Sequence, residues 1–316
     1  MMVRLIVGAG DVLQCQPVVR PEGTYMNTKK LIRFSVGVLC LCGTGIVLAQ
    51  ESAPGVNGPP KVLVIQREYL KPGRSGNVHV RSESAFVRAM SAAKWPTHYI
   101  GMNSLSGPSR ALFFVPYESF AAWEKDNEAT EHNATLSSAL DRAAVADGDL
   151  LTSYDSSAWT YSEEDSLNAE GGLAEQHYME ITSFKVRPGH RKEWENLVKM
   201  AKSGYANVPN MHWAAFESMY GADNGGLYLV VTPMKSLAEV DAEQAQSKQF
   251  MDAMGESGMK KFSELEASCV EKVQTNLFQF DPKMSYPPEA WVKANPGFWK
   301  ATMTAPEKKA AAKPAP

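Results

Sequence analysis

The sequence predicts an α+β protein that is built from two tandem units with the same order of elements, β-α-β-β-α-β. The first observation is a repeat, because three landmark pairs recur at nearly constant spacing: Pro72 and Pro188 at 116 residues, His98 and His212 at 114, and Pro116 and Pro233 at 117. The second is that strand and helix patterns follow these landmarks in the same order in both halves. A spacing this steady indicates an internal duplication.

The first unit is expected over residues 61–161. Its opening strand is a β-branched run that Pro72-Gly73 ends, and its first helix carries apolar residues at helical spacing. The elements expected in order are a strand from Lys61 to Leu70, a helix over 76–93, strands from His98 to Leu105 and Arg110 to Val115, interrupted helix from Tyr117 to about Asp147, and a strand from Ser157 to Tyr161.

The second unit is expected over residues 175–281, after a linker over 162–174 that is rich in Ser, Glu, Asp and Gly. Its elements repeat the order of the first: strand from His177 to Val186, helix from His190 to Tyr205, a hairpin formed by His212 to Met219 and Gly226 to Thr232, interrupted helix from Ser236 to about Val273, and strand from Thr275 to Phe280. Each unit therefore has the ferredoxin-like, split βαβ order.

A ferredoxin-like sheet has helices on one face only, so its other face is bare. In these units the bare face is apolar in either register, because it carries Val62, Val64, Tyr99, Tyr178 and Trp213 or the residues that alternate with them. Exposed apolar sheet of this size is unfavourable in water. We therefore expect the two units to pack sheet to sheet within one chain, as an intrachain dimeric α/β barrel.

The N-terminal region has the pattern of a secretory signal peptide over residues 26–49. A short basic stretch with Lys29, Lys30 and Arg33 precedes 15 mostly apolar or small residues, and Val47-Leu48-Ala49 resembles a cleavage site. The apolar run is shorter than the ~20 residues that a transmembrane anchor needs. We expect a periplasmic or secreted protein, with residues 1–25 as a mis-assigned start and 50–60 as a linker.

Two segments follow the second unit. Residues 282–300 carry Trp291, Phe298 and Trp299, which is too apolar for a free tail, so we expect them to wrap across a groove. Residues 301–316 are rich in Ala, Pro and Lys and are expected to be disordered.

Charge and cysteine content restrict the classes of partner. Without residues 1–49 the chain has 27 basic and 33 acidic residues, a net charge of −6, which argues against nucleic acid or an anionic membrane surface as the main partner. Only Cys269 remains, so an intrachain disulfide is excluded. Its helical, apolar surroundings favour a buried, inert thiol.

The strand that ends in Lys/Arg-Pro-Gly, followed by a charged helix start such as His190-Arg191-Lys192-Glu193, resembles the dimeric α/β-barrel superfamily. That superfamily includes NIPSNAP-like proteins, antibiotic-biosynthesis-type monooxygenases and haem enzymes of the chlorite dismutase type. The resemblance covers roughly residues 61–281 and implies two sheets that close into a barrel, with a ligand pocket in many members. It implies no single chemistry.

His98 and His212 are the candidate catalytic residues. They occupy equivalent positions at the start of the second strand of each unit, on the same strand face as Ile100 and Ala214. They are interpreted either as acid/base or ligand-binding groups beside an apolar pocket, or as strand-edge histidines that bond to a neighbouring loop.

The candidate ligand-binding residues lie on the opposite strand face or in the first strand of the second unit: Tyr99, Asn103, Glu180, Trp213 and Glu217. If that face is the barrel interior, they form a polar seam there, and Glu180 with Glu217 would be a carboxylate pair that raises one pKa. The alternative is that these acids pair with Arg67, Arg110 or Lys185.

The sequence predicts no metal site and no cofactor. It has a single cysteine in the predicted mature chain and no His-x-His or His-x-x-x-His spacing, and no glycine-rich loop joins a strand to a helix. Haem of the chlorite dismutase kind would need a proximal histidine in the second unit, for which His177, His190 and His212 are formal candidates.

We therefore expect an exported small-molecule-binding or non-catalytic barrel, with a cofactor-independent monooxygenase-like enzyme and a haem protein as alternatives. Whether it is an enzyme is left open. A small-molecule ligand and a homodimer are the candidate partners, and nucleic acid and stable membrane insertion after signal cleavage are not expected.

Overall fold

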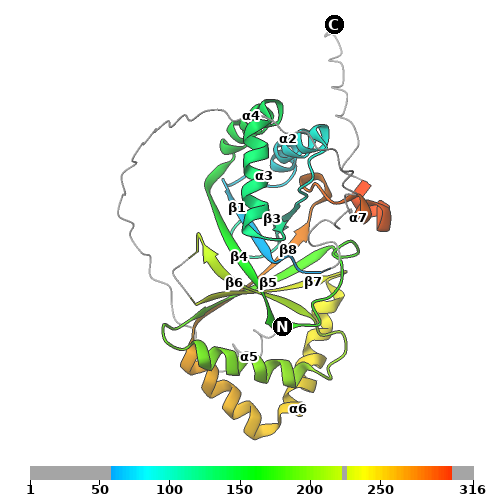
Figure 1. Cartoon of the computed structure of the whole chain (residues 1–316). Helices are drawn as coiled ribbons and strands as arrows, with labels where there is room; N and C mark the ends of the chain where they lie inside the picture. The colour runs from blue at the N-terminus through cyan, green and yellow to red at the C-terminus, as the bar shows by residue number, and fades with distance from the viewer. Residues whose placement is uncertain (1–57, 223–225, 301–316) are drawn as a thin grey trace, which may run out of the picture.

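Eight antiparallel strands close into one barrel in the order β1-β3-β2-β8-β5-β7-β6-β4 (Figure 1). The computed structural model describes residues 58–222 and 226–300. The strands are β1 (Val62–Leu70), β2 (Ile100–Ser104), β3 (Arg110–Tyr117), β4 (Leu151–Leu167), β5 (Tyr178–Val186), β6 (Trp213–Tyr220), β7 (Leu227–Met234) and β8 (Val270–Phe280). The predicted upstream segment 1–25, signal peptide 26–49, most of linker 50–60 and tail 301–316 lie outside the described residues.

The two halves of the chain contribute four strands each, in corresponding order. The N-terminal half runs β4-β1-β3-β2 around the barrel, and the C-terminal half runs β8-β5-β7-β6. Hydrogen-bonded pairing of β2 with β8 and of β4 with β6 joins the halves, so the sheet has no free edge. The α+β class and the barrel are thereby confirmed.

The barrel interior is filled by the apolar residues that point inward from both halves. One buried cluster contains Leu63 and Ile65 of β1 together with Met179 and Ile181 of β5, and Trp159 joins them from β4. Val62, Val64, Tyr99 and Trp213 belong instead to clusters outside the barrel, under the helices. The barrel interior is therefore formed by Leu63, Ile65 and their equivalents, which alternate along the strands with Val62, Val64 and the other outward-facing residues.

Helices cover opposite sides of the barrel (Figure 1). On one side lie α2 (Asn77–Ala93), α3 (Phe120–His132) and α4 (Ala134–Gly148), and on the other lie α5 (Arg191–Tyr205) and α6 (Ala238–Cys269). No helix in the described part of the chain is both long and apolar enough to cross a bilayer.

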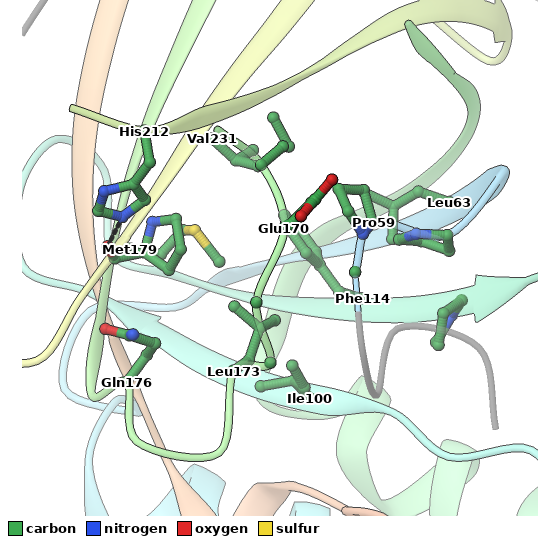
Figure 2. A pocket seen from close by; sticks show the side chains of 18 of the residues that line it. Pro59, Leu63, Ile100, Phe114, Glu170, Leu173, Gln176, Met179, His212 and Val231 are labelled. Atoms are coloured by element: carbon green, nitrogen blue, oxygen red, sulfur yellow. Dashed lines mark hydrogen bonds between the residues drawn. The ribbon is translucent and has the colours of Figure 1, made fainter. Parts of the chain in front are cut away.

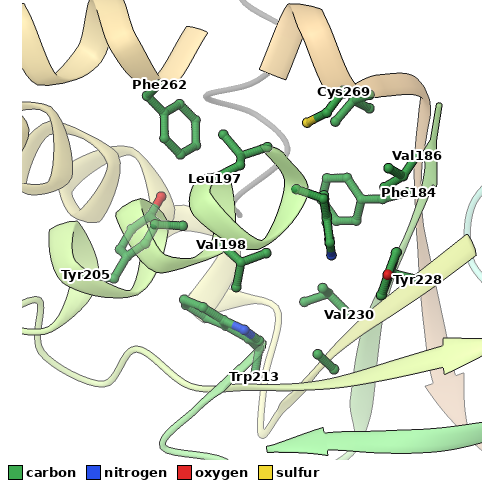
Figure 3. Close-up of a cluster of buried hydrophobic side chains, with 14 of the residues drawn as sticks. Phe184, Val186, Leu197, Val198, Tyr205, Trp213, Tyr228, Val230, Phe262 and Cys269 are labelled. Carbon is green, nitrogen blue, oxygen red and sulfur yellow. The ribbon is translucent and has the colours of Figure 1, made fainter. Parts of the chain in front are cut away.

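The second side has a larger aromatic core than the first. Figure 3 shows side chains of this core. Helix α5 buries Trp194, Leu197 and Val198, which follow helical spacing, against Phe184 of β5. Cys269 belongs to this cluster, and burial raises the pKa of its thiol to about 11. The expectation that Cys269 is buried is confirmed.

Two elements differ most from their sequence-based bounds. Strand β4 continues through Leu167, into the predicted linker, because its first part pairs with β1 and its last part with β6. Residues 270–273 were expected to be helical but begin β8, where Val270 pairs with Val186. A local sequence pattern does not predict that one strand pairs with strands of both halves.

The segment after β8 packs on the barrel. It contains η1 (Pro282–Met284), α7 (Glu289–Ala294) and α8 (Pro296–Trp299). Trp299 is fully buried and its indole donates a hydrogen bond of 2.8 Å to the carbonyl of Ala174. Tyr286 adds a bridge to Tyr99 at the start of β2. The segment therefore covers the end of the barrel at which β2 begins.

Candidate functional site

A cavity of about 130 Å³ opens at the end of the barrel where β2 and β6 begin (Figure 2). Its floor is formed by interior residues of both halves, among them Leu63, Ile100 and Phe114 from one half and Met179 and Val231 from the other. These side chains are apolar because they continue the buried core. The cavity is thus the part of the barrel interior that side chains leave unfilled.

The loop between β4 and β5 forms one wall of this cavity. Asn168 to Leu173 and Gln176 line it, and Figure 2 shows Glu170, Leu173 and Gln176 on this loop beside the apolar floor. Pro288 and Trp291 of the C-terminal segment add a further wall. The cavity is therefore apolar at its base and has polar groups at its entrance.

His98 and His212 both line this cavity, as their equivalent sequence positions predict. The His98 ring lies against the ring of Tyr286, with centroids 4.7 Å apart and planes tilted by 35°, and its Nδ1 is buried without a hydrogen-bond partner among the described residues. Burial lowers the pKa of His98 below its ordinary 6.5, while a hydrogen bond to the backbone of Tyr286 acts in the opposite direction. Burial therefore favours the neutral imidazole.

His212 is held differently. Its Nδ1 lies 2.9 Å from the carbonyl oxygen of Asn210, and its Nε2 lies 2.9 Å from the carbonyl oxygen of Pro233. Each ring nitrogen thus faces a backbone carbonyl oxygen, and a neutral imidazole, which has a single N–H, can donate to only one of the two. Of the two candidates, only His98 keeps an unpartnered ring nitrogen within the described chain.

The predicted polar seam inside the barrel is not formed, because the strand face that carries Tyr99, Asn103 and Trp213 is not the interior face. Tyr99 packs under α2, Trp213 packs against Tyr205 under α5, and the Asn103 amide donates to Asp281 at 3.1 Å. Tyr99 and Trp213 nevertheless border the cavity at its rim, whereas Asn103 does not line it. Their alternation with the interior residues explains this placement, because adjacent strand residues face opposite sides.

The two predicted seam acids are also on the helix side. Glu217 accepts two hydrogen bonds from Arg191, at 2.8 and 3.0 Å, so its cation comes from α5. The three cations named from the sequence bind elsewhere: Arg67 to Asp155, Arg110 to Asn276, and Lys185 to Glu271. Glu217 thus has a basic partner, but a different one from those expected.

Glu180 lines a second, more polar groove of about 580 Å³ between the outer face of the second-half sheet and α6. Thr182, Thr232, Glu239 and Glu243 also line it, as does His212. Glu217 does not line this groove, so no shared site of Glu180 and Glu217 is formed.

The structure also contains a buried cluster of titratable residues that the sequence did not predict. Glu68, His79, Glu83 and Asp147 each place one possible ligand atom within 4.8 Å of the others. The available signal was the four-residue spacing of His79 and Glu83, which puts both on one helix face. Glu68 and Asp147 carry no comparable signal, because only the packing of β1, α2 and α4 brings them together.

Comparisons with known proteins identify fold relatives only. No family model matches the sequence, and no curated protein matches it. Among solved structures, the chain is similar to an anthrone oxidase-like protein (16% identity, TM-score 0.48, 72% of this chain and 94% of that one). It is also similar to a putative monooxygenase from Lactobacillus acidophilus NCFM (9% identity, TM-score 0.43, 69% of this chain and 93% of that one). A putative chlorite dismutase is similar too (11% identity, TM-score 0.43, 70% of this chain and 95% of that one). Likeness at this level assigns no activity to this chain.

Proposed function

We propose that this chain is a small-molecule-binding barrel whose ligand site is the cavity at the His98 end of the barrel. The observation that carries the proposal is the joining, in one cavity, of an apolar floor from both halves with His98. Small-molecule sites typically combine apolar walls with a few polar groups that orient the ligand. The expected ligand is a single aromatic ring, or an apolar molecule of that size, with one hydrogen-bonding group.

The size of the cavity supports this class of ligand. A cavity of about 130 Å³ is close to the ~150 Å³ apolar cavity that accommodates benzene in an engineered protein. The imidazole of His98, which lines the cavity, offers a polar contact. Phenol and indole are therefore suitable probes.

The architecture that we propose is a duplicated ferredoxin-like unit that forms an intrachain dimeric α/β barrel. The same strand order in both halves supports it, as does the near-constant spacing of the sequence landmarks. The signal-peptide pattern over 26–49 supports export to the periplasm or the exterior. Mass spectrometry of the N-terminus of protein recovered from outside the cytoplasm tests export, and an N-terminus upstream of residue 50 contradicts it.

Calorimetric titration with phenol and with indole tests the ligand site. Ala214 faces the cavity, so Ala214→Leu should fill it and abolish binding without removing a polar group. Val145→Leu is the matched control, because Val145 is 78% exposed on α4. Binding that survives Ala214→Leu, or no binding to the wild-type protein, contradicts the proposal.

A second candidate is a cofactor-independent oxygenase in which His98 is the general base. The position of His98 on the cavity wall and its lowered pKa favour it, because a neutral imidazole can accept a proton from an acidic C–H or O–H of an electron-rich aromatic molecule. The resulting anion is the species that donates electrons to O₂. Oxygen uptake with such substrates should be lost in His98→Gln and retained in a His212 variant that still folds.

Two of the three histidines named as possible haem ligands contact other groups of the chain. Both ring nitrogens of His212 face backbone carbonyl oxygens, and the His177 ring stacks on Phe298 with centroids 4.3 Å apart beside the Asn295 amide. The cavity is also far smaller than the ~300 Å³ at which sites for larger ligands begin. We therefore do not propose a haem protein.

A further inference from the structure

Four titratable side chains converge outside the barrel, on the side covered by α2 and α4. Glu68 projects from β1, His79 and Glu83 lie one helical turn apart on α2, and Asp147 lies at the end of α4. Helix α2 packs against α4, so the cluster is enclosed by three elements. None of the four residues lines the cavity of the proposed ligand site.

The distances match donor atoms that share one ion. His79 Nε2 lies 2.9 Å from Glu68 Oε2, 3.7 Å from Glu83 Oε1 and 3.7 Å from Asp147 Oδ1. Two donors bound to one ion at ~2.1 Å lie ~3 to 4.2 Å apart in octahedral geometry. The imidazole nitrogen is thus already at ligand spacing from all three carboxylates.

The cluster is closed to water and lacks enough hydrogen-bond donors. The residues are exposed by 7% for Glu68, 0% for His79, 3% for Glu83 and 1% for Asp147. Glu83 Oε1 and both oxygens of Asp147 are buried without a hydrogen-bond partner among the described residues. Buried carboxylate oxygens are costly unless a donor or a cation satisfies them.

The cluster also has more acidic than basic side chains. Within the described chain, His79 is the one basic side chain at ion-pair distance from these carboxylates. Three acids and one imidazole thus form a cage that favours a cation.

The other half of the barrel has an apolar core at the corresponding place. At offsets of 115 or 116 residues, Glu68 corresponds to Phe184, His79 to Trp194 and Glu83 to Val198. Those three residues are buried together, with the rings of Phe184 and Trp194 5.1 Å apart. Replacing a buried polar network by apolar side chains is often stabilising, so stability alone does not account for the acidic set.

We propose that Glu68, His79, Glu83 and Asp147 bind one divalent transition-metal ion. The donor set is one imidazole nitrogen with three carboxylates, which suits Mn²⁺, Fe²⁺ or Zn²⁺ better than the all-oxygen sites that Ca²⁺ and Mg²⁺ prefer. His79 coordinates through Nε2, the atom that faces the carboxylates. The ion neutralises the buried charge and ties β1, α2 and α4 together.

The experiment uses the full chain, first treated with chelator and then titrated separately with MnCl₂ and ZnCl₂. Calorimetry measures affinity, elemental analysis after gel filtration measures the ions retained per chain, and thermal unfolding measures the effect of each ion. The variants are His79→Gln and Glu83→Gln. Glu243→Gln is the matched control, because Glu243 is also a buried glutamate but lies on α6.

The expected result is one ion per chain and a higher unfolding temperature for the wild type and for Glu243→Gln. Loss of a ligand in His79→Gln or Glu83→Gln should weaken affinity by about 100-fold or more. No uptake by the wild type, or equal affinity in the ligand variants, overturns the proposal. Anomalous diffraction from the Mn²⁺-soaked wild type locates the ion without any variant, and an ion bound elsewhere overturns the proposal too.

Discussion

The Nε2 atom of His79 lies 2.9 Å from Oε2 of Glu68, and the two side chains are 0% and 10% exposed. This contact joins the first strand of the barrel to the helix that follows it. The other ring nitrogen of His79 has no hydrogen-bond partner within the described residues. The contact therefore adds one buried polar link between β1 and α2 to the apolar packing of Val80 with Tyr99 and Phe113.

Glu68→Ala should destabilise the chelator-treated protein by about 1–3 kcal/mol, because it leaves the buried imidazole of His79 without this partner. Glu68→Gln keeps an oxygen that can accept the same hydrogen bond, so its cost should stay below that of Glu68→Ala. Urea unfolding at pH 7 measures both. Equal losses in the two variants would mean that the contact itself contributes nothing.

Gly101→Ala should loosen the C-terminal segment. A Cβ at Gly101 would lie 2.5 Å from the carbonyl oxygen of Met284 and 2.9 Å from its Cβ, so the backbone of the segment must move. It would also disturb the 2.9 Å hydrogen bond from the Gly101 amide to Ser285 Oγ. We expect a loss of about 1–3 kcal/mol and faster proteolysis within residues 282–300.

Gly258→Ala is the control for this experiment, because a Cβ there meets nothing closer than 3.4 Å. Urea unfolding and timed digestion with a broad-specificity protease are the measurements. Unchanged digestion of Gly101→Ala would show that the segment tolerates the added methyl group and that the close approach at Gly101 is not required.

The sequence predicted the parts of the fold that follow from local periodicity. Alternation along the strands predicted that His98 shares a strand face with Ile100, and His212 with Ala214. All four residues line one cavity. It could not decide which strand face lies inside, because Val62 and Val64 are as apolar as Leu63 and Ile65. The inward face depends on how β2 meets β8 and β4 meets β6, and these contacts join distant segments.

The acidic cluster was even harder to predict from the sequence than the inward face of the strands. His79 and Glu83 are one turn apart on a helix, and a polar pair on an otherwise apolar face is a visible signal. Asp147 lies 64 residues beyond Glu83 and becomes a neighbour only because α4 packs against α2. A site formed by contacts between elements cannot be read from the pattern within each element.

Glu266, near the end of α6, should make stability depend on pH. Burial raises its pKa from 4.5 to about 7. A carboxyl whose pKa is raised in the folded state stabilises that state while protonated, so this contribution is complete below pH 4.5 and is lost as the pH rises through about 7. Urea unfolding across this range should show a decline that Glu266→Gln reduces. A variant with the wild-type pH profile would contradict this assignment.

His98 should titrate below 6.5, and a bound ligand should move its pKa further down. Burial disfavours the imidazolium, so its contribution to stability is present above pH 6.5 and is lost as the pH falls through the lowered pKa. Phenol or indole in the cavity excludes more water from the ring and should lower the pKa again. Proton NMR of the imidazole follows the titration, and His98→Gln identifies the resonance by its absence. Because His98 lines the cavity, a pKa that stays constant when the probe binds would place the probe elsewhere, even if the calorimetric titration reports binding.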